Sequence, residues 1–140
     1  MSAIRLNGAA AAAIRRHAID AYPNECCGAL IGTARDDMAL EIGDALPLAN
    51  VTEEGRRRRF RVGPDDYRQA ETYAARTGAD LVGFYHSHPD HPAEPSQYDL
   101  DHAWPNLSYV IVSVRATGAG DLRSWRLRAD RSAFEEELQS

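Results

Sequence analysis

The chain has 140 residues, of which 44% are apolar and 26% are charged, proportions that are typical of a folded domain rather than a disordered segment. Its net charge of −5 argues against a nucleic-acid-binding protein or a protein that binds anionic membranes, because both need a basic face. We therefore expect a single domain over residues 1–140 of a soluble, cytoplasmic protein, while the oligomeric state stays open.

The N-terminal third of the sequence predicts one helix followed by two strands. Alanine and isoleucine recur at helical spacing over residues 8–21, so this segment is expected to form an amphipathic helix that begins after Asn7 and ends before Pro23. A short apolar run at residues 26–32 predicts a strand that enters the core, and a second strand is expected over residues 39–48.

The only two cysteines, Cys26 and Cys27, are adjacent in the sequence. Neighbouring residues of an extended segment point to opposite faces, and adjacent cysteines rarely form a disulfide. Metal sites usually need a spacer between two cysteine ligands. We expect two reduced, buried thiols.

The middle of the chain predicts a polar segment and then a helix. Four consecutive arginines, Arg56–Arg59, lie in a stretch that is expected to be a loop or an exposed hairpin edge, where they could contact an acidic partner or simply discourage edge-to-edge aggregation. Pro64 is well placed as the first residue of a helix that buries Tyr67, Ala70 and Ala74 and ends at Gly78.

The C-terminal half predicts further strands of a covered sheet. Residues 80–88 and 107–114 are apolar and are expected to be central strands, whereas the alternating residues 122–128 suit an edge strand. A closing helix is expected to bury Phe134 and Leu138. Together these elements predict an α/β (α+β sandwich) fold in which helices flank a mixed sheet.

Where the strand over residues 80–88 ends, the sequence gathers groups that can bind a metal ion. His86 and His88 are two residues apart, so they point to the same face of a strand, and Asp99 follows after a proline-rich turn. Two histidines and one carboxylate leave a fourth tetrahedral position open, which is typical of catalytic zinc. The spacing of Ser96 and Asp99 is also that of a helix capping box, and the two roles are compatible.

The stretch "HSHPDHPAEPSQYD" resembles the core motif of the JAMM/MPN+ metalloprotease family, and every position of that motif is matched. "NECCGALIG" is similar to the upstream element of the family, with Glu25 in the place of its glutamate. The resemblance covers roughly residues 25–125 and implies the MPN/JAB fold, a curved mixed sheet similar to that of cytidine deaminases. It disfavours the inactive branch of the family, which lacks these ligands.

The resemblance also implies roles for individual residues. His86, His88 and Asp99 are expected to hold Zn²⁺, Glu25 to act as the general base, and Ser96 to stabilise the developing oxyanion. Without the resemblance, Glu25 would be read as a solvated loop residue. The implied partner is a small ubiquitin-like or sulfur-carrier protein, cleaved after its Gly-Gly terminus with release of an amino acid such as cysteine.

Three alternatives stay open from the sequence. The protein could be a broader isopeptidase that acts on carrier–protein adducts, or a carrier-binding module without catalysis. Two histidines and a carboxylate can also hold Fe(II) in a non-haem oxygenase. His91 and His102 are near the motif but are expected at the surface or behind the ligands, because a fourth protein ligand would close the open position.

Overall fold

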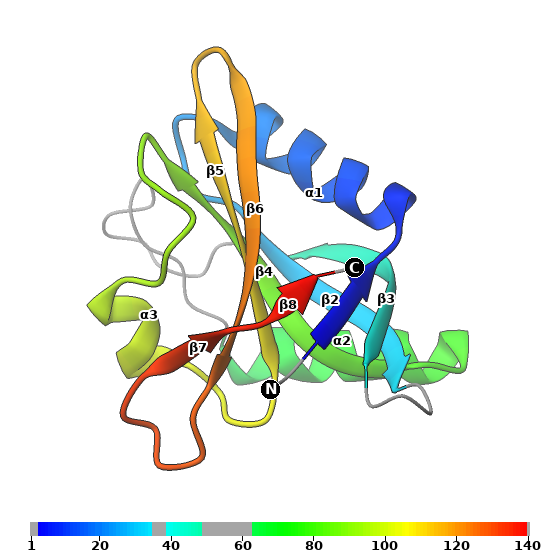
Figure 1. Cartoon of the computed structure of the whole chain (residues 1–140). Helices are drawn as coiled ribbons and strands as arrows, with labels where there is room; N and C mark the ends of the chain where they lie inside the picture. The colour runs from blue at the N-terminus through cyan, green and yellow to red at the C-terminus, as the bar shows by residue number, and fades with distance from the viewer. Residues whose placement is uncertain (1–2, 35–38, 49–62, 140) are drawn as a thin grey trace.

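The computed structural model describes residues 3–34, 39–48 and 63–139. In chain order the elements are β1 (Ala3–Leu6), α1 (Gly8–Ala21), β2 (Cys27–Ala34), β3 (Leu40–Leu48), α2 (Pro64–Thr77), β4 (Asp80–Pro89), α3 (Gln97–His102), β5 (Ser108–Arg115), β6 (Gly118–Leu127), β7 (Phe134–Glu136) and β8 (Leu138–Gln139) (Figure 1). The arginine-rich segment at residues 56–59 lies outside the described residues. None of the helices in the described ranges is long and apolar enough to cross a membrane.

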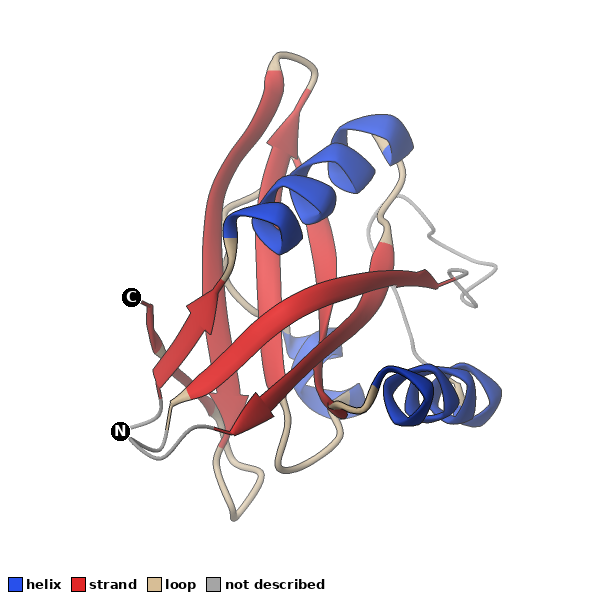
Figure 2. Cartoon of the chain, turned by 90° about the vertical axis from the view of Figure 1, so that its right-hand side faces the viewer, coloured by secondary structure: helices blue, strands red, loops and turns tan. Residues whose placement is uncertain are grey.

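The described strands form one mixed sheet in the order β7-β6-β5-β4-β2-β3-β1-β8. β4 runs parallel to β5, and β1 runs parallel to both β3 and β8, while the other neighbours are antiparallel. The sheet curves strongly, as Figure 2 shows, and its two ends approach each other. The Glu137 N–H, between β7 and β8, donates to the Ser124 carbonyl of β6 at 2.8 Å. The predicted α+β architecture with a curved mixed sheet is confirmed.

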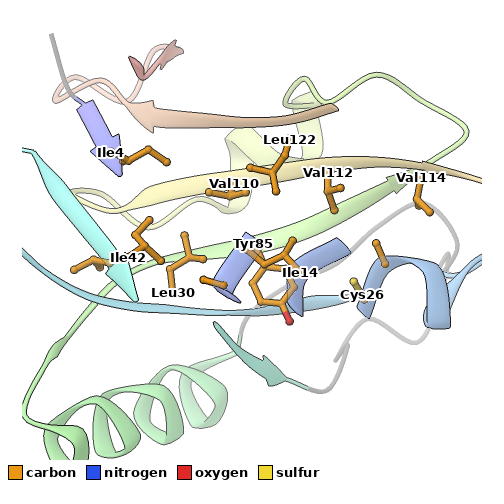
Figure 3. Close-up of a cluster of buried hydrophobic side chains, with 13 residues drawn as sticks. Ile4, Ile14, Cys26, Leu30, Ile42, Tyr85, Val110, Val112, Val114 and Leu122 are labelled. Carbon is orange, nitrogen blue, oxygen red and sulfur yellow. The ribbon is translucent and has the colours of Figure 1, made fainter. Parts of the chain in front are cut away.

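The sheet separates two apolar cores. Buried side chains of the first core converge between α1 and one face of the sheet (Figure 3): Ile4, Ala10, Ile14, Ala18, Cys26, Leu30, Ile42, Val82, Tyr85, Val110, Val112, Val114 and Leu122. The second core lies on the opposite face, against α2: Cys27, Ala29, Ile31, Leu48, Ala70, Ala74, Phe84, Ala103, Leu107, Tyr109 and Leu127. The two cysteines therefore face opposite cores, unbridged and buried, as expected.

The two long helices begin and end at the predicted residues. The Asn7 side chain accepts the Ala10 N–H at 2.7 Å and caps α1, which ends at Ala21. Pro64 is the first residue of α2, and Gly78 ends it with φ 76°, a left-handed conformation that costs glycine little.

Two predictions for the C-terminal region are wrong. β6 is not an edge strand, because β7 pairs with it. Phe134 and Leu138 lie on β7 and β8 and not on a helix; Phe134 packs against the second core as expected, whereas Leu138 is 59% exposed. The apolar spacing suits a helix, but strand pairing brings each of three consecutive acids to an arginine of β6 or its extension: Glu135 to Arg128 at 2.9 Å, Glu136 to Arg123 at 2.8 Å and Glu137 to Arg126 at 3.4 Å.

Gly83 in β4 allows the close pairing of β4 with β5. A Cβ atom at this position would overlap the backbone carbonyl of Ser108 in β5. We expect Gly83→Ala to lower the free energy of unfolding by about 1–3 kcal/mol, because the backbone of a central strand must shift. Urea denaturation measures this change. Gly8→Ala is the control, since a Cβ there meets nothing within 4 Å; equal stability of the two variants would contradict the prediction.

Candidate metal centre

The carboxyl end of β4 presents His86 and His88 on one face of the sheet. Both rings are buried and lie on the same side as Phe84 and the second core, as strand alternation predicts. Ser87 points to the other face, where its hydroxyl accepts the Cys26 N–H at 2.9 Å. β4 ends at Pro89, next to the parallel strand β5, and the carboxyl ends of parallel strands are a common place for functional sites.

Helix α3 brings Asp99 to the same point. Ser96 caps this helix: its hydroxyl oxygen accepts the Asp99 N–H at 3.1 Å, and its own N–H donates to Asp99 Oδ2 at 2.9 Å. The predicted capping box is therefore confirmed. It fixes the Asp99 carboxylate in the first turn of α3, with its side chain 7% exposed and turned towards the two histidines.

The three potential ligand atoms form a small triangle. His86 Nε2 and His88 Nε2 are 3.0 Å apart, and each lies 3.2 Å from Asp99 Oδ2. Ligand atoms bound at about 2.0–2.1 Å to a tetrahedral zinc ion lie roughly 3.3–3.4 Å apart, so the triangle has almost the size that zinc requires. Among the described residues, these three are the group of histidine, cysteine and acidic side chains that could hold an ion. The donor set and its geometry fit zinc.

Neighbouring groups keep the three side chains in the protonation states and tautomers that can bind a metal ion. Burial lowers the pKa of His86, so its imidazole is neutral at physiological pH. His88 Nδ1 lies 3.0 Å from the Pro92 carbonyl, which can only accept, so Nδ1 carries the proton and Nε2 keeps its lone pair. Burial alone would raise the pKa of Asp99, but His86, His88 and the Ser96 N–H outweigh it and hold this pKa well below its usual value.

Glu25 lies beside this triangle. The residue is 4% exposed and lies two positions before β2, whose first residue, Cys27, pairs with His86 of β4. The Ser87 N–H donates to the Cys26 carbonyl at 3.1 Å, and continuing this register brings Glu25 level with His88 on the same face. A pocket of about 310 Å³ joins them; it is lined by Glu25, His88, Pro89, His91, Pro92, Glu94, Pro95 and Ser96.

The structure thus brings all five predicted site residues to one place, and it adds groups that the sequence reasoning missed. The Pro92 carbonyl orients His88, and Asp90 accepts from the Tyr22 hydroxyl at 3.0 Å, which ties the segment before Glu25 to the end of β4. Neither contact has a local sequence signal. His91 and His102 are exposed; His102 stacks on Tyr98 and does not enter the triangle.

The two cysteines do not contribute to this centre. Burial raises the pKa of Cys26 to about 11 and that of Cys27 to about 12, so both thiols stay protonated and unreactive.

The chain is similar in sequence to a known family and to named proteins. Residues 8–128 match the family model described as prokaryotic homologs of the JAB domain. The desampylase of Haloferax volcanii is 37% identical over 92 residues, which is 65% of this chain and 63% of that protein, so the chain spans less than two thirds of its length. The CysO-cysteine peptidase of Mycobacterium tuberculosis is 32% identical over 114 residues, covering 79% of this chain and 73% of that protein.

The fold has close counterparts among solved structures. The solution structure of a Salinibacter ruber protein superposes with a TM-score of 0.76 at 42% identity, over 97% of this chain and 91% of that one. The match to the family model covers most of the chain, including β2, β4 and α3, which carry or adjoin the five residues of the site. The chain therefore belongs to the JAMM/MPN+ family, among the prokaryotic homologs of the JAB domain.

Proposed function

We propose that this protein is a zinc-dependent hydrolase that cleaves the amide or isopeptide bond after the C-terminal Gly-Gly tail of a small ubiquitin-like protein. One observation carries the proposal: two imidazole nitrogens and a carboxylate oxygen lie 3.0–3.2 Å from one another, next to a pocket that Glu25 and Ser96 also line. Membership of the JAMM/MPN+ family favours hydrolysis over the iron-oxygenase alternative.

Each residue has a defined task in this proposal. His86, His88 and Asp99 would hold the ion, which as a Lewis acid would lower the pKa of a bound water to about 7 and polarise the scissile carbonyl. Glu25 accepts the proton of the attacking water and passes it to the leaving amine. The Ser96 oxygen already accepts the Asp99 N–H, so its own hydroxyl proton is free to stabilise the oxyanion.

The names of two relatives guide the choice of substrate. One is a desampylase and another is a CysO-cysteine peptidase. We propose a sulfur-carrier protein as the substrate, with cysteine as the released group and a place in cysteine biosynthesis in the cytoplasm. A general deconjugating isopeptidase is the second candidate. The contact of Arg56–Arg59 with an acidic carrier face stays a prediction.

The experiment that separates these substrates offers a carrier–cysteine adduct and a carrier–lysine isopeptide conjugate to the purified protein. Mass spectrometry identifies the products with and without a chelator. We expect hydrolysis that the chelator stops and added zinc restores, with the cysteine adduct cleaved faster. Preference for the lysine conjugate would favour the isopeptidase, and binding of the carrier without cleavage of either conjugate would favour the non-catalytic module.

Ser96 combines a structural and a catalytic role, which substitution can separate. Glycine is tolerated at a helix N-cap at a cost of only a few tenths of a kcal/mol, whereas alanine costs about 0.5–2 kcal/mol. We expect Ser96→Gly to keep nearly wild-type stability but to lower kcat by about 10²–10³-fold, because the donor to the oxyanion is lost. Steady-state kinetics and thermal unfolding measure the two effects; unchanged kcat would remove Ser96 from the reaction.

A further inference from the structure

The loop between β4 and α3 is held by a row of three hydrogen bonds to successive backbone carbonyls. The His91 carbonyl accepts from the Ser113 hydroxyl at 2.7 Å, the Pro92 carbonyl from His88 Nδ1 at 3.0 Å, and the Ala93 carbonyl from the Trp125 indole N–H at 3.1 Å. We call these three carbonyls the carbonyl row. The middle carbonyl, that of Pro92, sets the tautomer of the metal ligand His88.

The three donors come from adjacent strands and share one face of the sheet. Ser113 of β5 pairs with His88 of β4, and Trp125 of β6 pairs with Tyr109 of β5, whose ring packs in the second core. Residues two or four apart on a strand keep the same side, so Ser113 and Trp125 both point towards the loop. The row is therefore clamped by the sheet at both of its ends.

Trp125 is itself fixed in position. The Arg123 guanidinium lies over its ring at 4.7 Å and is held by two hydrogen bonds to Glu136, at 2.8 and 2.9 Å. The same guanidinium reaches Glu94, the residue after the carbonyl row, at 3.2 Å. Ala93, although it belongs to a loop, is only 2% exposed. The exposed loop is thus anchored to the sheet at its buried residue, Ala93.

We propose that Ser113 and Trp125 are positioning residues of the metal centre, an inference that rests on the proposed function. By fixing the carbonyls on either side of Pro92, they fix the peptide planes that aim the Pro92 carbonyl at His88 Nδ1. The His88 ring then keeps its Nε2 directed at His86 and Asp99. The same loop leads into Ser96, which caps α3 and holds Asp99. Ser113 and Trp125 therefore help to position two of the three ligands, His88 and Asp99.

The test uses substitutions that delete one donor each, and control variants account for the change in side-chain size. Trp125→Phe removes the indole N–H and Ser113→Ala removes the hydroxyl, while Ser113→Thr keeps a hydroxyl. Loss of outer partners of a metal ligand typically weakens metal binding by about 10–100-fold. We expect zinc affinity, measured by competition with a chromogenic chelator, to fall about 3–10-fold in each single variant and about 10–100-fold in the double variant. Ser113→Thr, which keeps the hydroxyl, should bind zinc as tightly as the wild type.

Two matched controls exclude a general effect of the substitutions. Trp104→Phe makes the same exchange at the chain's other tryptophan, and Thr72→Val removes a hydroxyl that donates to the Arg68 carbonyl on α2. Both should bind zinc as the wild type does. Long-range ¹H–¹⁵N spectra of the histidine rings give a second readout: His88 should be a single Nδ1–H tautomer in the wild type and a mixture in the double variant.

The outcomes distinguish this inference from the proposed function. Wild-type zinc affinity and a single His88 tautomer in folded Ser113→Ala and Trp125→Phe would overturn the positioning role and leave the proposed function intact. A wild-type protein that binds no zinc would overturn both. Ser113→Ala and Trp125→Phe each remove the hydrogen bond at one end of the carbonyl row. If one of these variants misfolds, the other still tests the positioning role.

Discussion

Glu25→Gln is expected to lower the rate of hydrolysis by about 10²–10⁴-fold, the usual contribution of a general base, while zinc binding and carrier binding stay at wild-type levels. Glutamine has nearly the same shape as glutamate, but its amide cannot accept the proton of the attacking water. Glu25 is 4% exposed and lines the pocket with His88, and it is not one of the three triangle residues, so its loss should affect the chemistry rather than the metal.

Single-turnover hydrolysis of a carrier conjugate measures the rate, and elemental analysis measures the bound zinc. Glu135→Gln provides the control, because Glu135 is an exposed glutamate on β7, paired with Arg128, outside the residues that line the pocket. Hydrolysis by Glu25→Gln within about tenfold of the wild-type rate would show that another group takes the proton.

Asp99→Asn is expected to weaken zinc binding by about 10²-fold or more, since a direct ligand should matter at least as much as its outer partners. Hydrolysis should be lost in proportion at limiting zinc. The amide oxygen of asparagine can still accept the Ser96 N–H, so the cap of α3 should survive. The substitution therefore removes the charge that faces His86 and His88 without unfolding the helix that carries it.

Chelator competition measures the affinity, and circular dichroism reports whether the protein stays folded. Asp101→Asn is the matched control: it makes the same exchange two residues further along α3, where the carboxylate only accepts from Gln97 at 2.8 Å. An Asp99→Asn protein that binds zinc as tightly as Asp101→Asn would mean that Asp99 serves the helix cap and not the metal.

The geometry of the candidate site could be predicted where it depends on local rules. The alternation of a strand places His86 and His88 on one face, and the spacing of Ser96 and Asp99 specifies a capping box; both rules act over a few residues. Glu25 is different, because its place beside His88 depends on the register between β2 and β4. Only the family resemblance indicated it from the sequence.

The contacts that support the site could not be predicted in the same way. The Trp125 indole N–H donates to the Ala93 carbonyl, 32 residues away in the sequence, and no periodic pattern of residues predicts such a contact. The C-terminal strands were missed for a related reason. Phe134 and Leu138 have helical spacing, but the partners that decide between helix and strand are arginines of β6, which a local pattern does not include.

The division of the sheet into two faces has a practical consequence for protein engineering. Tyr85 and Ser87 alternate with His86 and His88 along β4, so the core beneath α1 and the metal ligands occupy opposite surfaces of the same strand. Volume-conserving substitutions on the α1 side, for example at Val110 and Val112, should change the free energy of unfolding by less than about 1.5 kcal/mol and leave the metal ligands in place. The core beneath α1 can therefore be redesigned separately from the face of the sheet that carries the metal ligands.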